Sequence, residues 1–235
     1  MHDASKGKIF LASERGHTET DWFRSYNTFN FGQYQHEHKQ PFGPLYVLND
    51  DTLAGKRTIK LLVEEASVIV LLPVVGAIIY KDSNGNRATL EAGEVQFFFT
   101  PKGTTVEICN PFETELINYL QLWLKCSSEQ PSSRLIAFDI ESDTNRLIEL
   151  LSFRSASSLF VLKASIGIFD GREEAVYKLS NTNHGLFVFV LQGAFEVQNR
   201  LLETRDGLAL WDIEEIELEA LSNEAIILLI EIRLD

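Results

Sequence analysis

Histidines are the side chains of this sequence best suited to bind a transition metal, and their spacing limits what they can do. The chain has five of them: His2, His17, His36, His38 and His184. Only His36 and His38 lie close together, in a polar segment with no strand directly after it, so we interpret them as solvated loop residues. A mononuclear iron, copper or zinc centre normally uses several imidazoles. The sequence therefore predicts neither a metal site nor a metal cofactor.

Other chemistry has little support in the sequence. There is no glycine-rich phosphate loop, no serine nucleophile elbow and no Cys-x-x-Cys motif. The two cysteines are Cys109, expected to be a packed thiol, and Cys126, expected to be exposed. Lys125 precedes Cys126, and a neighbouring cation favours the oxidisable thiolate. A redox response through Cys126 is therefore one alternative hypothesis.

Charge and length set further bounds. The net charge of −13 and the pI near 4.9 argue against direct binding to nucleic acid and to anionic membranes. The N-terminus has no apolar stretch of signal-peptide length, no apolar run spans a bilayer, and two cysteines suit a reducing compartment. We therefore expect a cytoplasmic protein. A chain of 235 residues suits one large domain or two small ones.

The elements that must position any site are predicted to be strands. Residues 68–75 form an apolar, β-branched run that ends at Gly76, and residues 77–81 lead into an Asn-Gly-Asn turn at 84–86. Residues 94–100 form a further strand, which ends at Pro101 because proline cannot donate to a ladder. Closely spaced strands with glycine turns predict an all-β sandwich or barrel.

The second half repeats this order. An apolar run at 185–192 ends at Gly193, and Asp206-Gly207 precedes a short strand, as Ala92-Gly93 does in the first half. Residues 225–234 form a final strand. The repetition predicts a duplicated barrel with short helical turns. We expect an N-terminal domain at 1–125, a polar linker at 126–134 and a C-terminal domain at 135–235.

Several motifs together resemble the pirin family. They are FNFG at 29–32, FGPLYVLNDD at 42–51, DSNGN at 82–86, LEAGEVQ at 90–96 and LQLW at 120–123. We predict that the last two residues of the second motif, Asp50 and Asp51, cap a turn after its strand. The resemblance is dense from about residue 22 to 124 and thin in the second half. It implies a bicupin, with two tandem cupin-type jelly-roll barrels in one chain.

The metal ligands of the family are missing by this comparison. Metal-binding pirins carry a His-x-His pair and, later, a His-x-Glu element. The first pair falls on Leu62 and Glu64, and the second on Val106 and Ile108. A catalytic site needs about three protein ligands, and only Glu64 supplies an oxygen. The resemblance therefore implies a pirin without its metal.

The leading hypothesis is a non-catalytic pirin-like module that binds a small apolar ligand in the N-terminal barrel or acts through a protein partner. The expected pocket lining is Leu62, Glu64, Tyr80, Gln96, Val106 and Ile108. An alternative implied by the resemblance is a quercetin 2,3-dioxygenase-type oxidoreductase, which would need a metal. A transcriptional cofactor role, also implied by the resemblance, would need a protein partner.

Overall fold

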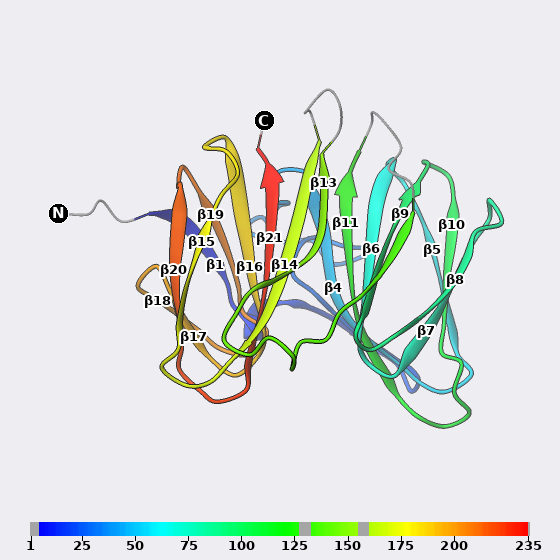
Figure 1. Ribbon diagram of the computed structural model, residues 1–235. Helices are drawn as coiled ribbons and strands as arrows, with labels where there is room; N and C mark the ends of the chain where they lie inside the picture. The colour runs from blue at the N-terminus through cyan, green and yellow to red at the C-terminus, as the bar shows by residue number, and fades with distance from the viewer. Residues whose placement is uncertain (1–4, 127–132, 155–159, 235) are drawn as a thin grey trace. The chain divides into compact units, whose positions relative to one another are not determined.

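The chain is almost entirely β-strand. The computed structural model describes residues 5–126, 133–154 and 160–234. Within these residues the only helix is the short 3-10 turn η1 (Ala12–Glu14), beside the strands β1 to β21 (Figure 1). The all-β prediction is confirmed. Two compact units divide the chain: Gly16–Pro41 with Leu45–Phe138, here the N-terminal barrel, and Met1–Arg15 with Phe42–Pro44 and Asp139–Asp235, here the C-terminal barrel.

The N-terminal barrel consists of two antiparallel sheets. The larger sheet contains, in spatial order, β12 (Arg134–Ala137), β9 (Glu94–Thr100), β6 (Ser67–Val75), β11 (Ile117–Lys125), β4 (Leu45–Leu53), β3 (Phe23–Asn27) and β2 (Gly16–Glu19). The smaller sheet contains β5 (Thr58–Leu62), β10 (Thr105–Cys109), β7 (Ala77–Asp82) and β8 (Arg87–Glu91). The predicted Asn-Gly-Asn turn joins β7 to β8, with Gly85 at a φ of 89°.

The C-terminal barrel repeats the plan. Its larger sheet contains β1 (Lys6–Phe10), β19 (Gly207–Trp211), β16 (His184–Gln192), β21 (Ala225–Arg233), β14 (Val161–Phe169) and β13 (Ile148–Arg154). Its smaller sheet contains β15 (Glu174–Lys178), β20 (Glu215–Ala220), β17 (Phe195–Val197) and β18 (Arg200–Leu202). Strands β4 to β11 and β14 to β21 thus occupy matching places, which confirms the predicted duplication.

Each barrel has its own apolar core. The strands β6 and β16, the two apolar runs that end at a glycine, are buried along most of their length because both lie inside the larger sheet. Tyr80 and Phe98 stack in the N-terminal core with ring centroids 3.9 Å apart. Phe169 meets Phe195 edge to face in the C-terminal core, at 5.9 Å. These contacts hold the two sheets of each barrel together.

Two strands require a correction of the predicted domain boundaries. β1, expected in the first domain, pairs with β19 of the C-terminal barrel. β12, expected in the second domain, pairs with β9 of the N-terminal barrel. Both are edge strands whose partners lie far away in sequence, so local patterns carry no information about the pairing. Residues 127–132 of the predicted linker lie outside the described residues.

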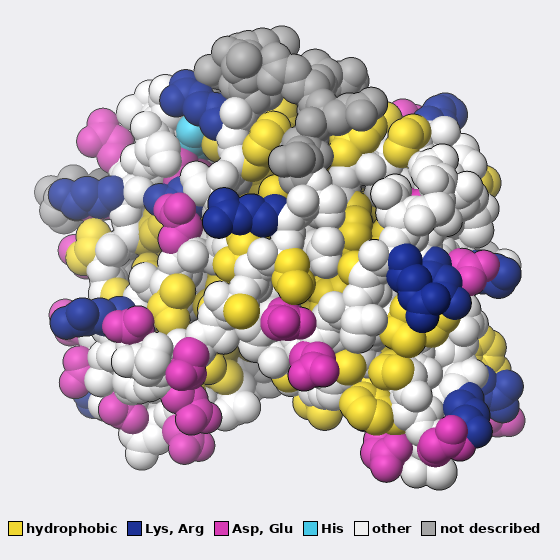
Figure 2. Space-filling model, turned by 45° about the vertical axis from the view of Figure 1, so that its right-hand side comes forward, with side chains coloured by type: hydrophobic (Ala, Val, Ile, Leu, Met, Phe, Trp, Pro, Cys, Tyr) yellow, Lys and Arg dark blue, Asp and Glu magenta, His cyan; other side chains and the backbone are white. Residues whose placement is uncertain are grey.

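The surface mixes charges of both signs. On the face drawn in Figure 2, acidic and basic side chains are interspersed with hydrophobic and neutral ones. Among the described residues there is no helix long and apolar enough to cross a membrane.

The buried side chain of Asn110 bonds to the backbone of three other residues of the N-terminal barrel, and its contribution to stability can be tested. This residue, 3% exposed, follows β10, and its Nδ2 donates to the backbone oxygens of Leu53 (2.9 Å) and Glu115 (2.8 Å). Its Oδ1 accepts the backbone N–H of Phe112 at 2.9 Å. We expect Asn110→Ala to lower the free energy of unfolding by about 2–4 kcal/mol, because it leaves buried backbone groups without partners. Urea unfolding measures this.

The matched control is Asn86→Ala in the exposed turn after β7. Asn86 Nδ2 donates only to the Asp82 carboxylate, at 2.8 Å, in a solvent-exposed position. Water replaces this bond, so we expect a loss of at most about 1 kcal/mol. Equal losses in the two variants would contradict the role given to Asn110.

Candidate functional site

The side chains of β5 alternate between the core and the solvent, and this decides which residues face the barrel interior. Ile59 and Val63 are buried, and Leu61 packs against the core. Leu62 is 59% exposed and Glu64 is also exposed. The prediction that Leu62 and Glu64 line a pocket is therefore wrong by one residue. A one-residue shift moves every side chain to the other face of a strand.

On the neighbouring strand β10, the side chains at the predicted lining positions face the core. Val106 and Ile108 are fully buried, and they oppose Leu61 and Ile59 of β5. The inward residues at the family's ligand positions are thus all aliphatic, and none of them can donate to a metal. In the described part of the chain no group of three or more His, Cys, Asp or Glu residues could hold a metal ion. The residues present do not fit the metal that the fold family implies.

The two remaining predicted lining residues are each held by a hydrogen bond. Tyr80 is fully buried, and its hydroxyl donates to Asp82 at 3.0 Å. Gln96 donates from Nε2 to Ser133 Oγ at 2.8 Å, in an exposed position. Leu62 and Glu64 thus lie outside the barrel, whereas Val106 and Ile108 pack in its core.

An open cavity of about 490 Å³ does lie in the N-terminal barrel, beside the predicted place. It is formed by β2, β3, β4, β5 and β11 with the residues around Phe31. Its lining is Thr18, Trp22, Phe23, Ser25, Asn27, Phe31, Gly32, Gln33, Asp51, Thr58, Ile59, Lys60, Leu61 and Gln121. One wall is aromatic and aliphatic, and the other is polar. This combination is typical of small-molecule sites.

Asp51 is the central polar group of this cavity. Its side chain is fully buried, and Gln121 Nε2 donates to its Oδ2 at 2.5 Å. Trp123 Nε1 in turn donates to Gln121 Oε1 at 2.8 Å, which fixes the orientation of the amide. Oδ1 of Asp51 has no partner with hydrogen-bonding geometry among the described residues. This unsatisfied oxygen is itself buried, and it belongs to a residue in the wall of the cavity.

The environment also changes the acidity of this carboxyl. Burial raises the pKa of Asp51 to about 7, although the nearby side chains of Ser25, Gln121 and Tyr119 lower it. The negative charge of Asp50 adds a smaller upward effect on the pKa. Burial and Asp51 together raise the pKa of Tyr119 well above its usual value, so this phenol stays neutral. Both protonation states of Asp51 are accessible near neutral pH.

A second unsatisfied group lies next to Asp51. Asn49 is 1% exposed, and neither its Oδ1 nor its Nδ2 has a hydrogen-bond partner within the described chain. In the sheet it stands opposite Gln121 on one side and Asn27 on the other, and Asn27 donates to Ser25 Oγ at 3.0 Å. Because buried polar groups without partners are rare, we take this polar layer as the candidate functional site.

Sequence reasoning missed Asp51 because it placed the residue in a turn. β4 continues to Leu53, so Asp50 and Asp51 lie within a strand and the prediction of a capped turn is wrong. The signal was present: Val47, Asn49, Asp51 and Leu53 share one face by the two-residue period of a strand. Two apolar residues at the ends of that face place the two polar ones inside the barrel.

The other predicted reactive groups do not assemble into a site. Cys126 is buried, at 3% exposed, contrary to the prediction, because it directly follows β11 and its N–H donates to Ala66 O. A buried thiol has little access to oxidants, which removes the basis for a redox response. His36 and His38 are exposed, and a backbone N–H of His38 donates to His36 Nδ1 at 3.2 Å.

His184 begins β16 and is part of a buried cluster in the C-terminal barrel. Its Nδ1 lies 2.5 Å from Oε1 of Glu231, which is fully buried. Tyr177 donates its hydroxyl to Glu231 at 2.7 Å, and Ser180 donates its backbone N–H at 2.8 Å. Burial alone would raise the pKa of Glu231, but these bonds hold it below its usual value. The carboxylate is well satisfied, so we assign it a structural role.

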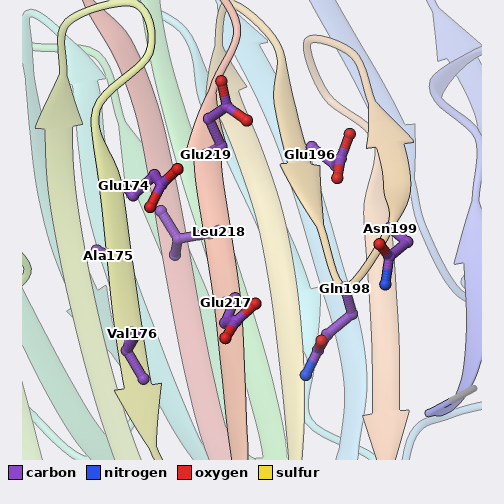
Figure 3. A pocket seen from close by; sticks show the side chains of 9 residues that line it. All are labelled: Glu174, Ala175, Val176, Glu196, Gln198, Asn199, Glu217, Leu218 and Glu219. Carbon is purple, nitrogen blue, oxygen red and sulfur yellow. The ribbon is translucent and has the colours of Figure 1, made fainter. Parts of the chain in front are cut away.

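A second hollow, of about 240 Å³, lies on the C-terminal barrel against β15, β17 and β20 (Figure 3). Glu174 stands opposite Glu219, and Glu219 stands opposite Glu196, so three carboxylates from three strands share one face. Arg172 Nη1 contacts Glu219 at 3.0 Å and offsets part of the repulsion. Acidic side chains on an exposed face do not by themselves define a site.

The two barrels with matching strand order define the protein as a bicupin. Residues 10–124 match the profile of the family described as "Pirin", and residues 162–232 match the "Quercetinase C-terminal cupin domain". The chain belongs to the pirin family. The second half of the chain resembles the pirin motifs only weakly because it matches a separate family model, that of the C-terminal cupin domain.

Known relatives agree with this assignment. A quercetin 2,3-dioxygenase from Escherichia coli K12 is 24% identical over 220 residues, which cover 92% of this chain and 95% of the relative. The crystal structure of YhhW from Escherichia coli has a TM-score of 0.82 at 22% identity and covers 98% of this chain and 99% of its own. A nickel(II) complex of bacterial pirin YhhW has a TM-score of 0.80, at 22% identity over 98% of this chain and 100% of its own. At these identities the structural likeness shows the fold alone.

The raised pKa of Asp51 gives a testable dependence of stability on pH. The pKa of the Asp51 carboxyl rises on folding from 3.8 to about 7, so its contribution to stability is fully present below pH 3.8. This contribution is lost as the pH rises through the folded-state pKa, and the total loss in the free energy of unfolding is about 4 kcal/mol. In Asp51→Asn this penalty is absent. We expect the stability of the variant relative to wild type to rise by about 2 kcal/mol between pH 5.5 and 8.5.

Urea unfolding of both proteins at several pH values measures the difference. Asp170→Asn, on the C-terminal barrel, serves as the control for loss of one charge. Parallel pH profiles of wild type and Asp51→Asn would contradict the assigned acidity.

Proposed function

We propose that this pirin-family bicupin is a non-catalytic binding module that holds a small, largely apolar ligand in its N-terminal barrel. The observation that carries the proposal is the cavity of about 490 Å³ with an unsatisfied Asp51 oxygen in its wall. Trp22, Phe31 and Leu61 supply apolar contact area, while Asp51 and Gln121 fix the orientation of a ligand.

A binding module of this kind would act by changing its interactions when the ligand binds. We propose that a protein partner recognises the ligand-bound state, in the cytoplasmic location that the sequence predicts. The net charge of −13 disfavours nucleic acid and anionic membranes as direct partners. The interspersed charges on the face in Figure 2 are consistent with this, since nucleic-acid binding uses clustered basic side chains.

The alternative is an oxygenase, and it rests on the name of relatives such as the quercetin 2,3-dioxygenase of Escherichia coli K12. Such chemistry uses a metal to activate and orient its reactants. The inward positions Leu61, Val63, Val106 and Ile108 supply no ligand for a metal. The donor set therefore favours the binding module.

Metal content separates the two proposals. We expect elemental mass spectrometry of the purified, untagged protein to find much less than one transition metal per chain. Dialysis against nickel(II), iron(II) or copper(II), followed by gel filtration, is expected to leave this unchanged. One tightly retained metal per chain, together with turnover of quercetin, would overturn the non-catalytic proposal.

A substitution that places a larger side chain in the cavity tests whether the cavity binds a ligand. Leu61 lines the cavity and Leu62 is 59% exposed, so the same substitution at adjacent residues has opposite consequences. We expect Leu61→Trp to weaken binding of the neutral fluorescent probe N-phenyl-1-naphthylamine at least tenfold, because the indole occupies the cavity. Leu62→Trp is expected to bind the probe as wild type does.

Fluorescence titration measures the affinities, and thermal unfolding confirms that both variants are folded. Equal affinity in Leu61→Trp and wild type would show that the probe binds elsewhere. No saturable binding to wild type would argue against the cavity as a ligand site.

A further inference from the structure

We propose that the N-terminal cavity accepts an organic cation, an amine or quaternary ammonium compound whose positive charge pairs with Asp51. The apolar groups of this cation would contact Trp22, Phe23 and Phe31. The inference rests on the proposed binding function and adds the chemical class of the ligand.

The first argument is that Asp51 has no counter-ion. The side chains that approach it, Ser25, Tyr119 and Gln121, are all neutral. Buried carboxylates in proteins are normally paired with a cation or strongly hydrogen-bonded, because removal from water is costly. Here one oxygen, Oδ1, is buried with no partner among the described residues, and its residue forms part of the wall of an open cavity. A ligand cation would complete the pair.

Lys60, the one lysine or arginine in the cavity lining, is already paired with another carboxylate. Lys60 lines the cavity, but its Nζ lies 2.6 Å from Glu107 Oε1, and its side chain is 66% exposed. The lysine therefore lies at the rim with its charge already paired. Because Lys60 is paired with Glu107, the positive charge that would balance Asp51 must come from the ligand.

The aromatic wall suits the same ligand class. Trp22 and Phe23 lie with ring centroids 6.1 Å apart, and Phe31 completes this side of the cavity. The faces of aromatic rings attract ammonium groups, and quaternary ammonium compounds are often held in this way. Trp22 already carries the guanidinium of Arg57 5.6 Å from its ring centroid, so a cation is tolerated at this wall.

Long-range electrostatics favours the same sign of charge. A protein of net charge −13 attracts cations to its surface and repels anions. An anionic ligand would bring a second negative charge beside Asp51. A neutral ligand would satisfy Oδ1 through a hydroxyl but would leave the carboxylate without a counter-ion.

Proton release is a signature of the pairing. A cation binds the ionised form of Asp51. Because burial raises the pKa of this carboxyl to about 7, binding of a cation below pH 7 must release the proton that the carboxyl carries. The other ionisable groups around this carboxyl are Asp50 on β4, Tyr119 on β11 and Lys60 on β5. We expect the affinity for a cation to rise from pH 5.5 to about pH 7.5 and then to level off.

The experiment compares two probes of the same shape, phenyltrimethylammonium and the neutral tert-butylbenzene, by competition against N-phenyl-1-naphthylamine. At pH 8 we expect the cation to bind wild type at least tenfold more tightly than the neutral probe. Asp51→Asn is expected to bind both with affinities that agree within about twofold. Asp170→Asn, which removes the same charge on the other barrel, is expected to keep the preference of wild type.

Calorimetry of phenyltrimethylammonium binding at pH 6, in buffers of different ionisation enthalpy, tests proton release without any variant. Equal or tighter binding of tert-butylbenzene to wild type would overturn the cation proposal and leave the binding module intact. A preference retained in Asp51→Asn would also overturn it. Failure of both probes and of N-phenyl-1-naphthylamine would overturn the cavity itself as a ligand site.

Discussion

The alternation of side chains along β4, β5 and β11 determines what the N-terminal barrel encloses. On β4 and β11 it turns Asn49, Asp51 and Gln121 inward, and on β5 it turns Leu61 inward and Leu62 outward. Pairing between β4 and β11 then brings Asn49 opposite Gln121. A shift of one residue in β11 would put Leu120 or Leu122 in the place of Gln121, and a shift in β4 would turn Asn49 and Asp51 away from the interior.

This polar layer makes the barrel less stable than an apolar filling would. Asp51 is buried without a counter-ion, and Asn49 has no partner within the described residues. Stability alone would favour aliphatic side chains, as at Val106 and Ile108 on the opposite sheet. Functional sites often hold such unfavourable groups because a ligand needs them. The polar side chains of this barrel interior lie on the wall formed by β3, β4 and β11.

The duplicated C-terminal barrel resolves its buried charge differently. Glu231 lies on β21, the counterpart of β11, and receives bonds from His184, Tyr177 and Ser180. Its carboxylate is satisfied by the protein itself, so no ligand is required. The same strand plan therefore carries a closed structural cluster in one barrel and, in the other, a buried carboxyl with one unsatisfied oxygen beside a cavity.

The sequence by itself determined the all-β class and the duplication, because these follow from local composition and glycine turns. Only the tertiary structure decided that β1 and β12 change barrels and that Leu61, rather than Leu62, faces the interior. Long-range strand pairing sets both, and no local pattern encodes it. The meeting of Asp51 with Gln121 across β4 and β11 has the same origin, since their separation of 70 positions is bridged only by the sheet.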